Sequence, residues 1–164
     1  MTIILKNKHS LEIDNFKFKC CVGKNGISKK KIEGDYKTPK GSFKIEKLYY
    51  RADRLNKPFT KLKCVKISKS MGWCNDINDN SNYNKLVDTK KKTKYEKLFR
   101  KDFKYDLIIP IKYNWKGKKL GKGSCIFLHL TKNYEPTAGC VALCKKDFLI
   151  MLRLINTKTK IKIY

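Results

Sequence analysis

The chain has 164 residues, of which 41% are hydrophobic and 12% aromatic. This composition excludes a disordered chain and is typical of a single globular domain, here residues 1–164. Forty Lys and Arg residues against fourteen Asp and Glu give a net charge of +26, which favours a polyanionic partner or else reflects an A/T-rich genome. Only four of the forty are arginine, the residue that binds phosphate in a bidentate manner, so no specific nucleic-acid partner is expected.

Most segments alternate apolar and polar residues, which predicts strands. Residues 2–8 and 10–23 flank a polar turn and are typical of an opening hairpin. Segment 105–114 is rich in β-forming residues, but Pro110 favours an edge strand or a bulge there, because proline lacks the N–H that a central strand donates. Segment 125–130 is nearly all apolar, which predicts a strand buried on both faces. Further strands are predicted at 41–50, 62–68 and 159–164.

Helices are predicted in only two places. Segment 145–155 places Phe148, Leu149, Leu152 and Ile155 at helical spacing, which gives one apolar face. Segment 94–102 is interpreted as a second, short helix. Many strands with one or two short helices predict a mainly β barrel or sandwich.

The seven cysteines are irregularly spaced and form no C-x-x-C motif. This argues against a disulfide scaffold and favours a reducing compartment. The first residues lack the apolar core of a signal peptide, and no apolar run reaches the roughly 18 residues of a membrane helix. We therefore expect a cytoplasmic monomer without a membrane span, or a periplasmic one if it is exported by a route that the sequence does not show.

One of the two histidines, His129, lies near the end of the apolar run 125–130. Cys140 lies further along the chain, directly after Gly139. A glycine before a cysteine permits a tight turn that exposes the sulfur and aligns backbone N–H groups as an oxyanion hole. A histidine within hydrogen-bond reach would activate the thiol. Two alternatives stay open: a core histidine with a buried cysteine, and a zinc site that would use His129, Cys140 and Cys144.

Four motifs, in order from about Gly23 to Leu152, resemble the L,D-transpeptidase catalytic-domain family in its compact, single-domain branch. "HLTKNYEPTAGCVAL" looks like the catalytic motif, a histidine followed by Ser/Thr-x-Gly-Cys. "GDYKTPKGSFKI" is similar to the family's upstream TP-x-G-x-F segment. "GWCNDINDNSNYNKLV", and "YDLIIPIKYN" followed by "GKGSCIFLHL", resemble two further segments.

The resemblance implies a mainly β enzyme whose thiol cleaves the diamino acid–D-alanine bond of peptidoglycan tetrapeptide stems or muropeptides through a thioester. An amine acceptor would make it a transpeptidase, and water a carboxypeptidase. His129 would activate Cys140, backbone N–H groups near Gly139 and Cys140 would hold the oxyanion, and a backbone carbonyl would orient the imidazole. No metal or organic cofactor is implied. The expected substrate-binding residues are Trp73, Asp76, Asn114 and Thr137, with Trp73 and Asp76 placed at the rim of the cleft.

The sequence departs from the best-known branch of the family at two places beside the cysteine. Ala138 stands where that branch has histidine, and Val141 and Ala142 follow the cysteine where a polar residue, often Arg or Asn, is usual. Recognition of the substrate carboxylate is therefore expected from another part of the chain. The rival hypothesis from a different class is a basic nucleic-acid-binding module without catalysis, which predicts binding that depends steeply on salt.

Overall fold

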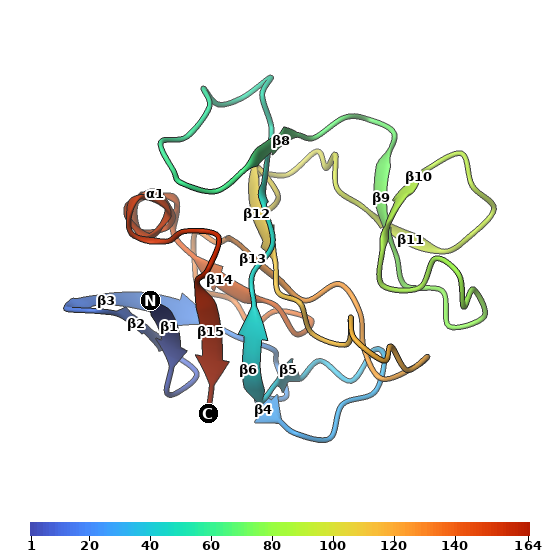
Figure 1. The fold of residues 1–164 in the computed structure, drawn as a ribbon, viewed down its shortest axis with the longest axis horizontal. Coiled ribbons are helices and arrows are strands. Elements are labelled where there is room, and N and C mark those ends of the chain that lie inside the picture. Colours follow the sequence, from blue (N-terminus) through green and yellow to red (C-terminus); the bar gives the residue numbers. More distant parts are fainter.

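The computed structural model describes residues 1–164 and confirms a mainly β fold with one helix (Figure 1). The strands are β1 (Thr2–Leu5), β2 (Ser10–Ile13), β3 (Phe16–Cys21), β4 (Ile27–Ser28), β5 (Thr38–Pro39), β6 (Gly41–Lys44), β7 (Leu48–Tyr50), β8 (Cys64–Lys66), β9 (Met71–Cys74), β10 (Leu86–Asp88), β11 (Tyr95–Lys97), β12 (Leu107–Pro110), β13 (Phe127–Leu130), β14 (Val141–Leu143) and β15 (Lys160–Ile163); the helix is α1 (Lys145–Leu154).

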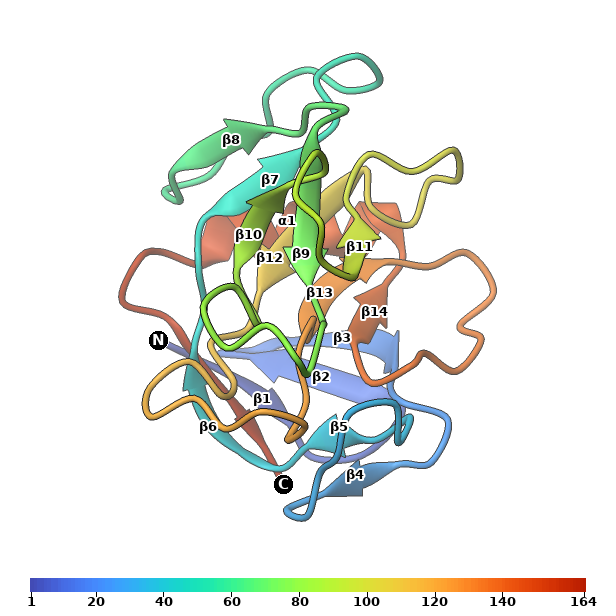
Figure 2. The same cartoon turned by 90° about the vertical axis from the view of Figure 1, so that its right-hand side faces the viewer.

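Ten strands form one curled sheet in the order β6-β15-β1-β2-β3-β14-β13-β12-β7-β8. Ile45, which follows β6, makes an isolated bridge to Ile111, which follows β12, so distant parts of the sheet meet. A smaller sheet, β10-β9-β11, stands apart on the right of Figure 1 and lies in front of β12 and β13 in Figure 2. Strands β4 and β5 form a parallel pair near the foot of the molecule.

The sheet separates two apolar clusters, and the central strand β13 contributes to both. Leu128 and Leu130, with Val141 and Leu143 of β14, belong to the larger cluster, while Phe127 belongs to the smaller one together with Cys140, which directly precedes β14. All residues of β13 and β14 are buried, as the continuous apolar run predicts.

Helix α1 covers the larger cluster with Phe148, Met151 and Leu152. Asp147 in its first turn and Arg153 in its last turn complement the helix dipole. The prediction of a helix here is confirmed, and Ile155 is buried directly after the helix ends.

Three local predictions are wrong in whole or in part. Segment 10–23 is two strands, because Asp14 adopts a left-handed φ of 48° and turns the chain between β2 and β3. Segment 94–102 contains strand β11 in place of a helix, because Tyr95–Lys97 pairs with β9. Strand β12 is central, between β13 and β7, so the edge-strand alternative for Pro110 is wrong. The pairing shifts by one residue between Tyr49↔Ile108 and the Ile45↔Ile111 bridge, which agrees with the bulge alternative. Pro110 is tolerated there because it is the last residue of the strand and its carbonyl accepts a hydrogen bond from Glu46 N.

Candidate active site

The register of two central strands brings His129 and Cys140 to the same face of the sheet. Strands β13 and β14 pair in parallel, with His129 opposite Ala142. Cys140 directly precedes β14, and its Sγ lies 3.3 Å from Phe127 N. Since side chains alternate along a strand, Cys140 and Ala142 face the same side as Phe127 and His129. Cys140 and His129 are therefore diagonal neighbours on adjacent strands.

The turn before Cys140 depends on Gly139. Its φ is +138°, and a Cβ at this position would lie 2.8 Å from the Lys37 carbonyl oxygen, so a side chain cannot be accommodated without moving backbone. Thr137 closes the turn: its hydroxyl donates to Cys140 O at 2.6 Å and accepts from Gly139 N at 3.1 Å. The predicted tight turn is present, and the Thr137 hydroxyl is used to hold it.

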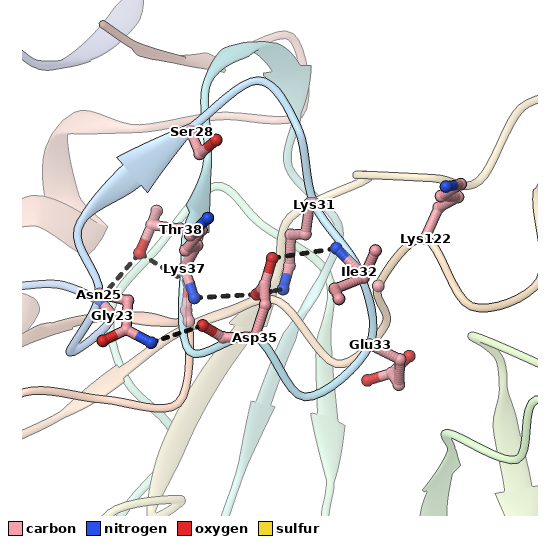
Figure 3. Close-up of polar contacts among 12 residues, drawn as sticks. Gly23, Asn25, Ser28, Lys31, Ile32, Glu33, Asp35, Lys37, Thr38 and Lys122 are labelled. Atoms are coloured by element: carbon pink, nitrogen blue, oxygen red, sulfur yellow. Dashed lines mark hydrogen bonds and ion pairs between the residues drawn. The ribbon is translucent and has the colours of Figure 1, made fainter.

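Thr38, from the TP-x-G-x-F segment, fixes the peptide bond between Gly139 and Cys140. Its side chain is fully buried. The hydroxyl donates to Gly139 O at 2.9 Å and accepts from Gly23 N at 2.9 Å; Figure 3 shows Thr38 beside Gly23. Because a trans peptide points its C=O and N–H in opposite directions, holding Gly139 O toward Thr38 turns the Cys140 N–H away from it.

The Cys140 N–H makes no hydrogen bond in the structure, although Cys140 is only 7% exposed. Buried backbone donors are almost always paired, so this unpaired N–H is informative. The neighbouring Gly139 N–H is engaged by Thr137. Of the two N–H groups expected to form an oxyanion hole, the structure leaves the one on Cys140 available.

The Cys140 thiol is a protonated, hydrogen-bonded group in this state. Its Sγ donates to Cys125 O at 3.2 Å and accepts from Phe127 N at 3.3 Å. Burial, reinforced by the nearby charge of Glu96, raises the pKa of Cys140 to about 12. The thiol therefore needs a base to become a nucleophile at neutral pH.

His129 can serve as that base, because its ring is neutral and its orientation is fixed. Nδ1 lies 2.9 Å from Leu130 O; a carbonyl only accepts, so Nδ1 carries the proton and Nε2 keeps its lone pair. Burial lowers the pKa of His129 to about 4. The Tyr105 ring packs edge-on against the imidazole, with 5.4 Å between centroids. The backbone carbonyl that the family resemblance implies is thus present.

Sequence reasoning missed Tyr105, which packs against the imidazole of His129, and Glu96, which contacts Tyr105. The Tyr105 hydroxyl donates to Glu96 Oε1, and Arg100 Nη1 lies 3.9 Å from the same oxygen. Burial raises the pKa of Glu96, while the Tyr105 hydroxyl and the Arg100 charge oppose the shift. The available signal was the rarity of acids: Glu96 stands between lysines in a chain with only fourteen carboxylates.

These groups open onto one cavity of about 480 Å³. Cys140, His129, Tyr105 and Glu96 line it, together with Thr137. Its charged walls are mixed, with cations and carboxylates both present; they comprise Lys31, Arg100, Lys104 and Lys132 against Glu33, Glu96 and Glu135.

The other predicted substrate-binding residues, Trp73, Asp76 and Asn114, do not line this cavity, although Trp73 and Asp76 are the two expected at its rim. Trp73 is a core residue, 3% exposed, whose Nε1 donates to Asn84 Oδ1 at 3.0 Å. The Asp76 carboxylate accepts the N–H groups of Asn78 and Lys94 at 3.0 and 3.2 Å, which lowers its pKa.

Asn114 is likewise outside the cavity. It has a left-handed φ of 54° and holds the loop that follows it, because its Nδ2 donates to Lys119 O and Gly123 O and its Oδ1 accepts from Lys119 N. A zinc site is not supported, because His129, Cys140 and Cys144 do not form a group that could hold a metal, and neither do any other three His, Cys, Asp or Glu side chains.

The mainly β domain thus has a cysteine after a glycine turn, a neutral histidine on the adjacent strand and an unpaired N–H on the cysteine, which are the groups that a cysteine acyl-transfer protein uses. Comparison with known families agrees with that class. A profile of the YkuD family, the L,D-transpeptidase catalytic domain, matches residues 2–163. The chain belongs to this family.

Two solved structures are similar to this chain. One is Bd1075 of Bdellovibrio bacteriovorus, with 14% identity and a TM-score of 0.49. The other is the helical cell shape determining protein Pgp2 of Campylobacter jejuni, with 15% identity and a TM-score of 0.50. Both similarities cover 99% of this chain but 47% and 46% of those proteins, so the chain spans about half of their length. No curated protein sequence matches it.

Proposed function

We propose that this domain is a cysteine acyl-transfer enzyme that acts on peptidoglycan tetrapeptide stems and cleaves the bond between the diamino acid and the terminal D-alanine. Membership of the L,D-transpeptidase catalytic domain family supports the peptidoglycan substrate. The observation that carries the chemistry is the unpaired N–H of Cys140, which lies in the residue that also supplies the thiol. A buried donor beside a nucleophile is the arrangement that a tetrahedral oxyanion requires.

In the acylation step, His129 Nε2 takes the thiol proton while Cys140 Sγ attacks the carbonyl carbon of the diamino acid. The carbonyl oxygen becomes an oxyanion and accepts the Cys140 N–H. The tetrahedral intermediate collapses, the C–N bond breaks, and His129 returns the proton to the nitrogen of D-alanine, which leaves as the free amino acid. A thioester on Cys140 remains.

The second step uses the same groups in reverse. His129 takes a proton from a water molecule or from an amine acceptor, and that nucleophile attacks the carbonyl carbon of the thioester. The C–S bond then breaks, and His129 returns the proton to Cys140 Sγ. Water gives a tripeptide, and an amine gives a cross-linked or tagged product. All of these steps use a thiol, an imidazole and backbone N–H groups, so the proposed mechanism needs no metal or organic cofactor.

The proposed compartment is a reducing one, where the substrates would be soluble muropeptides. All seven cysteines are free thiols in the structure, which supports this proposal. With ten residues, α1 is the chain's one helix and is too short to span a bilayer.

The test incubates the purified protein with a disaccharide tetrapeptide that ends in D-alanine, with and without an amine acceptor, and follows the products by mass spectrometry. We expect loss of D-alanine that is abolished in Cys140→Ala and in His129→Ala. A tripeptide with water alone would identify a carboxypeptidase, and acceptor adducts would identify a transpeptidase. Turnover that survives Cys140→Ala would refute the assignment of the nucleophile.

A further inference from the structure

A second hollow, of about 640 Å³, adjoins the Cys140 cavity and is lined mainly by lysines. We call it the lysine groove and define it by Lys29, Lys30, Lys31, Lys37, Lys119 and Lys122. Lys31 lines both hollows, so they lie on either side of the segment that carries this residue. The groove contains one carboxylate, that of Asp35, whereas the walls of the cavity are mixed in charge.

The wall between the two hollows is rigid. Lys31 Nζ lies 2.8 Å from Asp35 Oδ1, and the two side chains are only 3% and 7% exposed. Asp35 also accepts the N–H groups of Ile32 and Lys37, each at 2.9 Å, as Figure 3 shows. Asp35 therefore neutralises Lys31 and fixes the chain on both sides of itself, including the backbone of Lys37.

The opposite side of the groove is fixed as well. Asn114, which lines the groove, holds both the N–H and the carbonyl of Lys119. Tyr113, which also lines it, donates its hydroxyl to Lys122 O at 2.6 Å. Lys119 and Lys122 thus extend from an ordered loop. Apart from Lys31, no lysine of the groove has a carboxylate within 4.0 Å, so their charges are not compensated within the chain.

We propose that the lysine groove binds the carboxylate-bearing part of an acidic stem peptide whose scissile end lies in the Cys140 cavity. This inference rests on the proposed function and assigns its substrate a direction. The thiol marks the position of the bond that breaks, and the cationic groove beside it is complementary to a chain of carboxylates. The lysine groove, which lies outside the Gly139–Cys140 turn, also supplies the cationic side chains for substrate carboxylates that Val141 and Ala142 cannot provide.

The test compares a tetrapeptide stem that carries glutamate as its second residue with the same stem carrying glutamine. The variant is Lys119→Gln/Lys122→Gln, and the matched control is Lys146→Gln/Lys158→Gln, because those two exposed lysines line neither hollow. In the variant we expect the KM for the glutamate stem to rise about five-fold, with kcat unchanged. The KM for the glutamine stem stays the same, and the control behaves as the wild type. An equal rise for both stems, or no rise, would overturn the proposal.

A binding measurement keeps this test independent of turnover. Cys140→Ala protein, with and without the two groove substitutions, is titrated with the fluorescent glutamate stem and its anisotropy is followed. Weaker binding in the groove variant supports the proposal even if the wild type turns over no stem, which would defeat only the proposed function. If the groove substitutions weaken binding of a single-stranded oligonucleotide at about 150 mM salt and leave stem binding unchanged, the groove is a nucleic-acid surface and the proposal is wrong.

Discussion

Replacing Thr38 by valine tests whether this residue aims the oxyanion donor. Valine keeps the shape of the side chain but removes the hydroxyl, so Gly23 N and Gly139 O each lose a 2.9 Å hydrogen bond. Each unsatisfied buried group costs about 1–3 kcal/mol. The free energy of unfolding should therefore fall by about 2–6 kcal/mol, against the roughly 5–15 kcal/mol that keeps an ordinary domain folded.

Two kinetic measurements separate positioning from stability. Alkylation of Cys140 by iodoacetamide forms no oxyanion, and Thr38 does not contact the sulfur, so its rate should be unchanged in Thr38→Val. Acylation by the stem forms an oxyanion, and its rate should fall about ten- to a hundred-fold with KM unchanged, because the Cys140 N–H is no longer held in place. Thr38→Ser keeps the hydroxyl and should acylate at nearly the wild-type rate.

Urea denaturation gives the stability, and burst kinetics with mass spectrometry of the acyl-enzyme give the acylation rate. If Thr38→Val acylates as fast as the wild type, the peptide bond before Cys140 does not need this hydroxyl and the reasoning is refuted. If alkylation and acylation fall together, Thr38 supports the fold alone.

Three further predictions concern the catalytic pair and its turn. Burial lowers the pKa of His129 from 6.5 to about 4, so as the pH falls the unfolded chain binds a proton there before the folded chain does. The free energy of unfolding of the wild type should therefore fall by about 2 kcal/mol between about pH 7.5 and pH 5. Urea denaturation should show that this loss is absent in His129→Gln. Because the pKa of Cys140 is raised to about 12, alkylation of its thiol at pH 8 should be slower in the folded protein than in the protein unfolded in urea. Peptide mass spectrometry measures both rates, and a faster rate in the folded protein would indicate a preformed thiolate. Gly139→Ala should lower the free energy of unfolding by about 2–4 kcal/mol and abolish acylation. Gly121→Ala is the control, because a Cβ there would meet nothing within 4 Å; it should lower the free energy of unfolding by about 1 kcal/mol and leave acylation intact.

The strand pattern was readable from the sequence where burial alternates or is complete. Segments 125–130 and 159–164 became β13 and β15, and the apolar face of 145–155 became α1. The error at 94–102 has a physical cause: "KYEKLFRKD" has good helix formers, but pairing of Tyr95–Lys97 with β9 overrides local preference. Whether a central strand tolerates Pro110 depends on where that strand ends, and the apolar–polar periodicity of the sequence does not show this.

The site was partly readable for a similar reason. His129, Gly139 and Cys140 lie close together in the sequence and in a recognisable order, so local chemistry indicates them. Thr38 and Tyr105 come from distant segments, and only the folded chain brings them to the turn and to the imidazole. Asn114 is a polar residue at the end of a predicted strand, which suggests a binding role from sequence alone. Its side chain instead donates hydrogen bonds to Lys119 O and Gly123 O within the following loop, and the spacing of these residues in the sequence does not predict those contacts.

Strand β15 lies between β1 and β6 in the sheet, and Figure 1 shows it beside both. It pairs in parallel with β1, so Thr2 meets Lys160 across nearly the whole chain. During synthesis on the ribosome, β1 and β6 would emerge early and present unpaired edges until the last strand in chain order arrives. Such late, non-local closure slows folding and leaves nascent chains prone to association. The rate-limiting event in the biogenesis of this domain should therefore be the insertion of β15, and co-translational chaperones should engage the chain before that step.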